Sequence, residues 1–168
     1  MNTPPLARIA VGVVVERRPA TTAWVEHVWR PVGVLAGVPD AAPWTPLPGA
    51  SGAETFYAGA AEVALYRSET TNYRDNLASG QPSLWVVLRP TGSDPPFAVV
   101  TVTADPAEGE AFTETATDLV EAVPMPETIA AAVAAFVAEH HVERTFEKRR
   151  RDRADPEVFG RRRGEESR

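Results

Sequence analysis

The stretch IAVGVVVERRPATTAWVEHVWR, residues 9–30, decides the fold class of this chain. Its first part, residues 9–18, is rich in valine, and β-branched side chains favour strands because they pack well on a pleated surface. Pro19 and the small residues after it are typical of a turn, and residues 23–30 then predict a second strand. Pro31 comes next and lacks a backbone N–H, so we expect it to end or bend that strand at a sheet edge.

Three runs further along the chain have the same character. Residues 56–67 alternate with a period of two, which places Val63 and Leu65 on one face of a strand and polar side chains on the other. Residues 83–90 contain a continuous apolar run, as is typical of a central strand. Residues 96–105 predict another strand, so most of the chain up to this point is extended.

The order of elements changes at Asp105. This residue can cap a helix and Pro106 suits the first helical position, so residues 105–115 predict a short helix. Residues 118–126 return to an extended form. The alanine-rich stretch at residues 126–141 has apolar side chains at helical spacing, which predicts a long amphipathic helix packed against the sheet. Its apolar stripe consists of Ile129, Val133, Phe136, Val137 and His140.

Together these elements predict an α+β fold. We expect a mainly antiparallel β meander or partly open barrel of five to seven strands, with one long amphipathic helix near the C-terminus. A chain of 168 residues suits one domain. We therefore assign residues 1–143 to a single β-rich domain and residues 144–168 to a charged, arginine-rich flexible tail, because that segment has little apolar content to offset the entropy of ordering.

Charge is distributed unevenly along the chain. Residues 144–168 carry ten Lys or Arg and six Asp or Glu, whereas the rest of the chain carries seven and seventeen. The absence of cysteine excludes disulfides, thiolate nucleophiles and iron–sulfur clusters held by the chain itself. No stretch approaches the roughly 20 apolar residues of a membrane-spanning helix, and the apolar run after Arg8 lacks a signal-peptide cleavage site. We expect a cytoplasmic protein without a membrane span.

Candidates for catalysis are few, and His27 is the first. It shares a predicted strand face with Val25 and Trp29, where a histidine is usually packed or half exposed. The alternative is an acid–base role for His27 together with Glu16 or Glu26.

Other reactive patterns are weak or missing. His140 and His141 are adjacent, so on a helix they point about 100° apart and do not form the i, i+4 pair of a helical zinc site. The sequence contains no G-x-S-x-G elbow, no Walker loop and no G-x-G-x-x-G motif. We therefore predict no catalytic residue, no metal site and no cofactor.

Two Tyr-Arg dipeptides, Tyr66-Arg67 and Tyr73-Arg74, occur within residues 66–90. Tyrosine and arginine are common interface anchors, because each combines a broad apolar body with a directional polar group. One interpretation is a binding surface, and the other is a hairpin or loop held by Asn and Ser turn bonds. The candidate protein-binding residues of the chain are Trp29, Arg30, Arg67, Tyr73, Arg74, Phe146 and Phe159.

The arginine-rich tail allows three interpretations. It can be a solvated tail, a segment that folds on a protein partner through Phe146 and Phe159, or a nucleic-acid binder, because arginine runs neutralise phosphates. Interleaved Asp and Glu residues and the acidic body count against nucleic acid as the expected partner. A homo-oligomer through an unpaired sheet edge is also possible.

Three segments of the chain, in order, resemble an uncharacterised bacterial family of the domain-of-unknown-function 3305 type. That family is typically encoded beside molybdenum-dependent formate dehydrogenase genes, with an iron–sulfur protein and a dehydrogenase chaperone nearby. The resemblance implies no catalytic residues. It implies a non-catalytic accessory role in maturation, assembly or electron-transfer coupling of that enzyme, with one of its subunits or maturation factors as partner. The segments are VGVVVERRPATTAWVEHVWRPVGVLAG, LYRSETTNYRDNLASGQPSLWVVLRP and VEAVPMPETIAAAVAAFVAEHHVERTFEKRRRDR.

Two alternatives to a binding protein remain open. The first is a small-molecule or cofactor-processing enzyme that uses His27 with a nearby glutamate, and the second is a regulator that binds nucleic acid through its tail. The tryptophans help to distinguish core from docking face, because buried ones indicate packing and exposed ones indicate a binding surface. They are Trp24, Trp29, Trp44 and Trp85.

Overall fold

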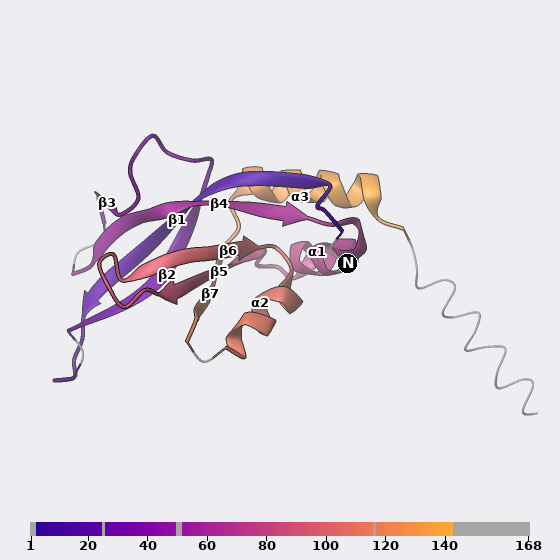
Figure 1. Cartoon of the computed structure of the whole chain (residues 1–168). Helices are drawn as coiled ribbons and strands as arrows, with labels where there is room; N and C mark the ends of the chain where they lie inside the picture. The colour runs from indigo at the N-terminus through magenta and orange to yellow at the C-terminus, as the bar shows by residue number, and fades with distance from the viewer. Residues whose placement is uncertain (1–2, 25, 50–51, 116, 143–168) are drawn as a thin grey trace, which may run out of the picture.

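Seven strands and three α-helices make up the described part of the chain, which covers residues 3–24, 26–49, 52–115 and 117–142 of a computed structural model (Figure 1). The strands are β1 (Ala7–Pro19), β2 (His27–Ala36), β3 (Thr45–Leu47), β4 (Glu54–Leu65), β5 (Ser83–Pro90), β6 (Phe97–Thr103) and β7 (Leu119–Pro124). The helices are α1 (Thr70–Ala78), α2 (Pro106–Thr113) and α3 (Glu127–His140), and a short 3-10 helix, η1 (Arg67–Glu69), precedes α1. The fold is α+β, as the sequence predicts.

The strands pair antiparallel in two sheets. The first sheet has the order β2-β1-β4-β3 and the second has the order β6-β5-β7. β4 lies against β6 and β2 lies against β7, yet no ladder joins either pair within the described residues, so the sheets do not close into a barrel. Two sheets form in place of one meander because η1 and α1 carry the chain away from the first sheet before β5 begins.

The strand expected at residues 23–30 lies further along the chain, where β2 runs from His27 to Ala36. Pro31 bends this strand and does not end it. The register along β1 steps from Gly33 directly to Pro31, which marks a bulge in the ladder. A proline, which has no N–H to donate, is tolerated at a bulge of an edge strand such as β2.

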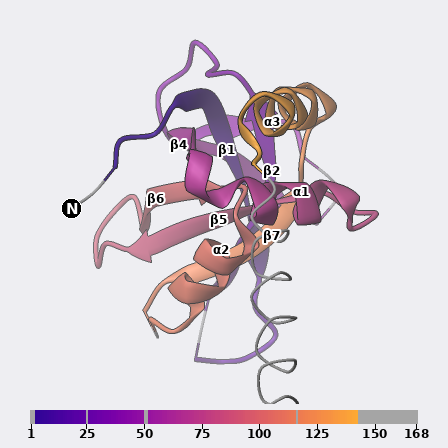
Figure 2. The same ribbon diagram turned by 90° about the vertical axis from the view of Figure 1, so that its right-hand side faces the viewer.

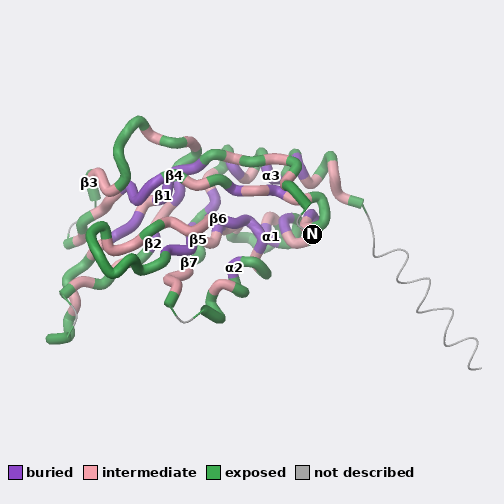
Figure 3. Tube along the Cα trace, in the orientation of Figure 1, coloured by how far each residue is buried: buried purple, intermediate pink, exposed green. Residues whose placement is uncertain are grey.

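The core lies between the two sheets. The alternation predicted for β4 is confirmed, because Val63 and Leu65 are 0% and 1% exposed, whereas Glu62 is exposed and Ala64 is half buried. Figure 3 shows the buried residues concentrated along the middle of the molecule. Buried aliphatic side chains of β1 and β5 complete this layer: Val11, Val13, Val15, Leu84, Val86 and Leu88.

α-Helices form within both stretches where the sequence predicts one. Asp105 caps α2, since its side chain accepts a 2.9 Å hydrogen bond from the Ala107 N–H and Pro106 follows in the first turn. α3 spans Glu127–His140 and buries Ile129, Val133 and Phe136 of the predicted stripe.

α1 was not predicted, and it replaces the hairpin or loop expected after Tyr66. Its buried residues are Thr70, Tyr73 and Asn76, which recur every third position and so share one helix face. That face packs against α3 and the second sheet, and tertiary contact therefore stabilises a helix whose own sequence favours it weakly.

The two ends of β1 are closed differently. Ala7 lies opposite Leu65 at the first end, and Arg17 lies opposite Glu54 at the second. α1 and α3 lie beside each other at the first end, as Figure 2 shows, and we call it the helical end. The second carries the β1–β2 hairpin, and we call it the hairpin end. At a rise of about 3.3 Å per residue the two ends are about 30 Å apart.

Candidate functional site

The β1–β2 hairpin exposes a tryptophan to solvent. Trp24 lies in the connecting loop and is 94% exposed. The loop is closed by a 3.1 Å hydrogen bond from the Ala20 N–H to the Glu26 carbonyl, so the position of Trp24 is anchored at the base of the loop. Large apolar side chains at this exposure are uncommon and often mark an interaction site.

Two arginines and a valine lie next to this loop on the outer face of the first sheet. Arg18 is directly opposite Val28, and Arg30 is two positions after Val28, so all three side chains point to the same face. Val28 is 53% exposed, and the Arg18 and Arg30 side chains are 50% and 61% exposed. We call Arg18, Trp24, Val28 and Arg30 the hairpin surface.

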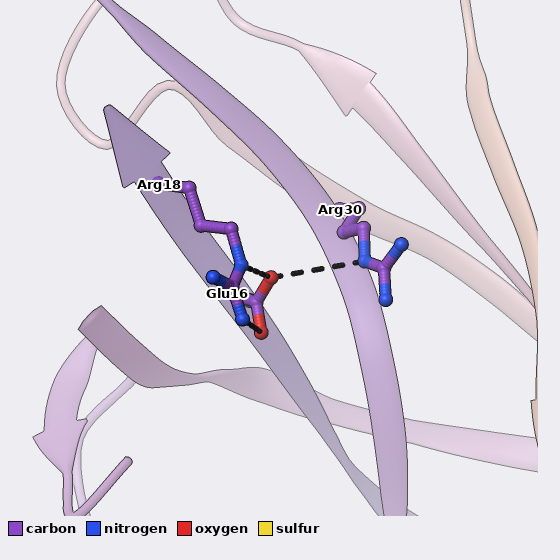
Figure 4. A network of polar contacts seen from close by, with 3 residues as sticks. All are labelled: Glu16, Arg18 and Arg30. Carbon is purple, nitrogen blue, oxygen red and sulfur yellow. Dashed lines mark hydrogen bonds and ion pairs between the residues drawn. The ribbon is translucent and has the colours of Figure 1, made fainter. Parts of the chain in front are cut away.

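Glu16 holds both arginines of the hairpin surface (Figure 4). Arg18 Nε donates a 2.5 Å hydrogen bond to Glu16 Oε1, and Arg30 Nε lies 3.8 Å from the same oxygen. The hydrogen bond and the charge of Glu16 raise the pKa of Arg18 above its ordinary value. The Glu16 side chain is 12% exposed. The two guanidiniums therefore cover one carboxylate and present their own charge to solvent.

A hollow of about 290 Å³ lies on the other side of the hairpin end. It is lined by Arg17, Pro19, His27, Gly52, Ala53 and Glu54. Arg17 forms an ion pair with Glu54, and its guanidinium carbon lies 5.3 Å from the ring centres of both Trp29 and Phe56. Arg17 Nε has no hydrogen-bond acceptor within the described residues. The guanidinium lies over the faces of the Trp29 and Phe56 rings instead.

His27 is half buried beside this hollow, apart from the two glutamates expected to assist it. Glu16 points to the opposite face of the sheet, where the arginines hold it, and Glu26 is exposed in the loop. Within the described residues no hydrogen bond joins His27 to either of them. Glu54 is the carboxylate that shares the hollow with His27.

Trp29 packs inward and does not contribute to the exposed face. Its ring centre lies 5.8 Å from those of Trp44 and Phe56 and 6.0 Å from that of Phe97. These four rings come from both sheets, so Trp29 joins the sheets at the hairpin end. Of the predicted pair on β2, Arg30 faces solvent and Trp29 forms part of this aromatic cluster.

The predicted binding residues Arg67, Tyr73 and Arg74 lie at the helical end, about 30 Å from Arg30. Tyr73 is 1% exposed, and its hydroxyl accepts a 2.9 Å hydrogen bond from the Tyr66 N–H. Burial raises the pKa of Tyr73 to about 12. Its ring packs edge to face against Phe136, with ring centres 6.1 Å apart. Tyr73 is therefore part of the core, and the five described candidates do not form one surface.

Arg74 is exposed but takes part in a bonding chain between α1 and the end of α3. Its Nη1 lies 3.0 Å from His141 Nε2, and His141 Nδ1 lies 3.0 Å from Thr70 Oγ1. Arginine can only donate, so Nε2 accepts and the proton of the imidazole resides on Nδ1. The Thr70 hydroxyl then donates to the Arg67 carbonyl at 3.3 Å. These polar groups are used to dock one helix on another.

The remaining candidates, Phe146 and Phe159, lie outside the described residues, as does the tail interpreted as a protein or nucleic-acid binder. Within the described part of the chain no group of three or more His, Asp or Glu side chains is arranged to hold a metal ion. No helix there is long and apolar enough to span a membrane.

The sequence matches the model of a family described as a protein of unknown function (DUF3305) over residues 10–150. The chain belongs to this family. The matched DUF3305 region includes both the hairpin surface and the junction of α1 with α3. No curated protein and no solved structure matches the chain.

Sequence reasoning missed Arg18 and Trp24. The strand predicted at residues 23–30 includes Trp24, because the tryptophan, valine and histidine after residue 22 are typical of an extended run. The signal for a longer loop is Pro19 followed by Ala and two Thr residues, since a proline and small polar residues favour an extended turn region. The signal for the arginine pair is the Glu16-Arg17-Arg18 sequence, whose alternate members share a strand face.

Proposed function

We propose that this chain is a non-catalytic accessory protein of the cytoplasm that binds a protein component of a molybdenum-dependent formate dehydrogenase system. Its binding assists maturation, assembly or electron-transfer coupling of that enzyme. The observation that supports binding is the hairpin surface, where Trp24 is 94% exposed in the loop that connects the strands of two exposed arginines. Tryptophan and arginine are the residues that most often dominate the binding energy of protein interfaces. The dehydrogenase as partner rests on the family resemblance of the sequence.

A binding experiment with separate components tests this proposal. The full chain is immobilised and exposed in turn to purified formate dehydrogenase subunits and to the iron–sulfur protein and dehydrogenase chaperone that the family resemblance implies. We expect one component to bind, and Trp24→Ala to weaken that binding by about tenfold or more, because a central aromatic anchor typically contributes this much. Leu6→Ala is the matched control, since Leu6 is 54% exposed at the helical end.

A deletion strain provides the second measurement. Loss of the chain should lower formate dehydrogenase activity or the molybdenum cofactor content of the purified enzyme. Unchanged activity and cofactor content, together with no binding to any component, would contradict the proposed function.

One observation favours a second candidate, a small-molecule or cofactor-processing enzyme. His27 lines a concave hollow together with Glu54 and Arg17, which supplies an imidazole, a carboxylate and a guanidinium in one place. A thermal-shift screen of metabolites against the wild-type chain and His27→Gln tests it. This candidate requires a ligand that stabilises the wild type but not the variant, followed by turnover of that ligand; stabilisation of both proteins alike counts against it.

A further inference from the structure

We infer that the partner presents an acidic segment to the hairpin surface, with carboxylates on Arg18 and Arg30 and an apolar side chain against Trp24 and Val28. This inference rests on the proposed function and names the chemistry of the partner. It is carried by the way in which one buried carboxylate holds two exposed guanidiniums.

Each of the two guanidiniums has N–H groups that do not approach Glu16. A guanidinium carries five N–H groups. Arg18 directs its Nε, and one Nη at 3.5 Å, towards Glu16, while Arg30 approaches Glu16 through Nε alone. The remaining Nη groups are available for the planar, paired bonding that arginine makes with carboxylates.

The net charge of Arg18, Arg30 and Glu16 is positive and also favours an anionic partner. Glu16 balances one of the two arginines and is itself covered by them, with 12% of its side chain exposed. The shared carboxylate also restricts the rotation of both side chains, so less freedom is lost when a partner binds. Acidic residues outnumber basic ones by seventeen to seven over residues 1–143, yet here two arginines on neighbouring strands share one face of the sheet.

Glu26 is an acidic residue two positions from both Trp24 and Val28 in the sequence. It is exposed at the base of the loop and forms no ion pair with Arg18 or Arg30 within the described residues. Its negative charge must weaken the attraction of an acidic segment, and its removal should strengthen binding. This gives a variant whose effect has the opposite sign to that of removing an arginine.

The apolar part of the surface defines the rest of the partner. Trp24 and Val28 are exposed by 94% and 53%. Val28 lies opposite Arg18, and Trp24 lies in the loop that connects β1 to β2. Burial of both requires an apolar side chain on the partner, flanked by carboxylates that reach the guanidiniums. An acidic segment with an apolar or aromatic centre meets both requirements.

The experiment measures binding of the dehydrogenase component identified above to four variants and one control. Arg18→Gln and Arg30→Gln, alone and together, should weaken binding, by about tenfold or more for the double variant, and should reduce its dependence on salt. Glu26→Gln should strengthen binding. Arg8→Gln is the control, because it removes an exposed positive charge near the other end of β1 and should change the affinity by less than about twofold.

A triple variant, Glu16→Gln with both arginine changes, is the control for misfolding of the double variant. It removes the whole charge network and leaves no buried carboxylate without a partner. If this variant and the double variant bind as tightly as the wild type while Trp24→Ala does not bind, the acidic partner is excluded and the proposed function survives.

A synthetic probe separates the two ideas when no component binds. It is a blocked octapeptide of Asp and Glu around a central Leu-Phe pair, compared with an Asn and Gln version of the same length. Binding of the acidic peptide that is lost in the double variant supports the inference even though the proposed function has failed. Equal binding of both peptides, or of neither, overturns the inference.

Discussion

At the helical end of β1, tyrosine, histidine and arginine side chains bond to neighbouring elements, whereas at the hairpin end arginine and tryptophan face solvent. Tyr73 and His141 each have their polar atoms directed at α1 or at the chain just before it. Arg30 and Trp24 lie on an outer strand face and in a loop that no other described element covers. An arginine such as Arg74 or Arg30 therefore bonds to a neighbouring helix or faces solvent according to whether a second element lies beside it.

The largest change in the free energy of unfolding is expected at Asn76, which is 4% exposed at the helical end. Its Nδ2 donates to the Ser83 and Ala104 carbonyls at 2.8 and 2.9 Å, and its Oδ1 accepts from the Ser83 N–H at 3.0 Å. Asn76→Ala leaves three backbone groups without partners, so we expect the free energy of unfolding to fall by about 3 kcal/mol. Urea denaturation measures this change.

Asn72→Ala is the matched control for Asn76. Asn72 is half buried and bonds to the side chains of Glu69 and Asp105. Solvent can also reach Glu69, and Asp105 has another partner in the Ala107 N–H. We expect a loss of about 1 kcal/mol. Equal losses for the two asparagines would show that burial does not distinguish them.

A smaller effect is expected where α2 packs on β5. A Cβ atom added to Gly109 would lie 2.3 Å from Trp85 Cγ, a contact that real side chains do not make, so the helix or the indole must move. Gly109→Ala should lower the free energy of unfolding by about 2 kcal/mol, because overpacking exceeds the gain in helix propensity. Gly33→Ala, on β2 with no atom within 4 Å of the added Cβ, is the control and should stay near the wild type.

The pH dependence of stability tests the burial of Tyr73. The hydroxyl titrates near pH 10.0 in the unfolded chain, whereas burial raises its pKa to about 12 in the fold. Its contribution is therefore complete below pH 10 and is lost as the pH rises towards 12, since the unfolded chain alone releases the proton. At pH 11 the loss is about 1 kcal/mol. Tyr73→Phe should lack this component when the free energies of unfolding at pH 9 and pH 11 are compared.

The elements that local patterns predicted are those whose stability is largely local. The alternation of buried and exposed residues in β4 and the Asp105 cap of α2 each depend on a few consecutive residues, and the structure confirms both. α1 was missed because Thr and Asn residues weaken its helix propensity and its stability comes from contacts with α3 and the second sheet. The spacing of Thr70, Tyr73 and Asn76 was the available signal.

The candidate surface was harder to predict than the strands that carry it. Arg30 is a binding candidate from its sequence context alone, whereas the exposure of Trp24 depends on where the hairpin loop ends. The inward position of Trp29 depends on rings contributed by β4 and β6, which are distant in sequence. Long-range packing thus decides which member of a Trp-Arg dipeptide remains available.

The smallest expected effect completes the comparison. Trp24→Ala should change the free energy of unfolding by less than about 0.5 kcal/mol, because a side chain that is 94% exposed loses little packing when it is removed. The same variant should weaken partner binding by about tenfold or more. Urea denaturation of the isolated chain gives the first quantity, and the component-binding experiment gives the second. A loss of stability above about 1 kcal/mol would instead place the indole in contact with the body of the protein, and the hairpin end would then resemble the helical end.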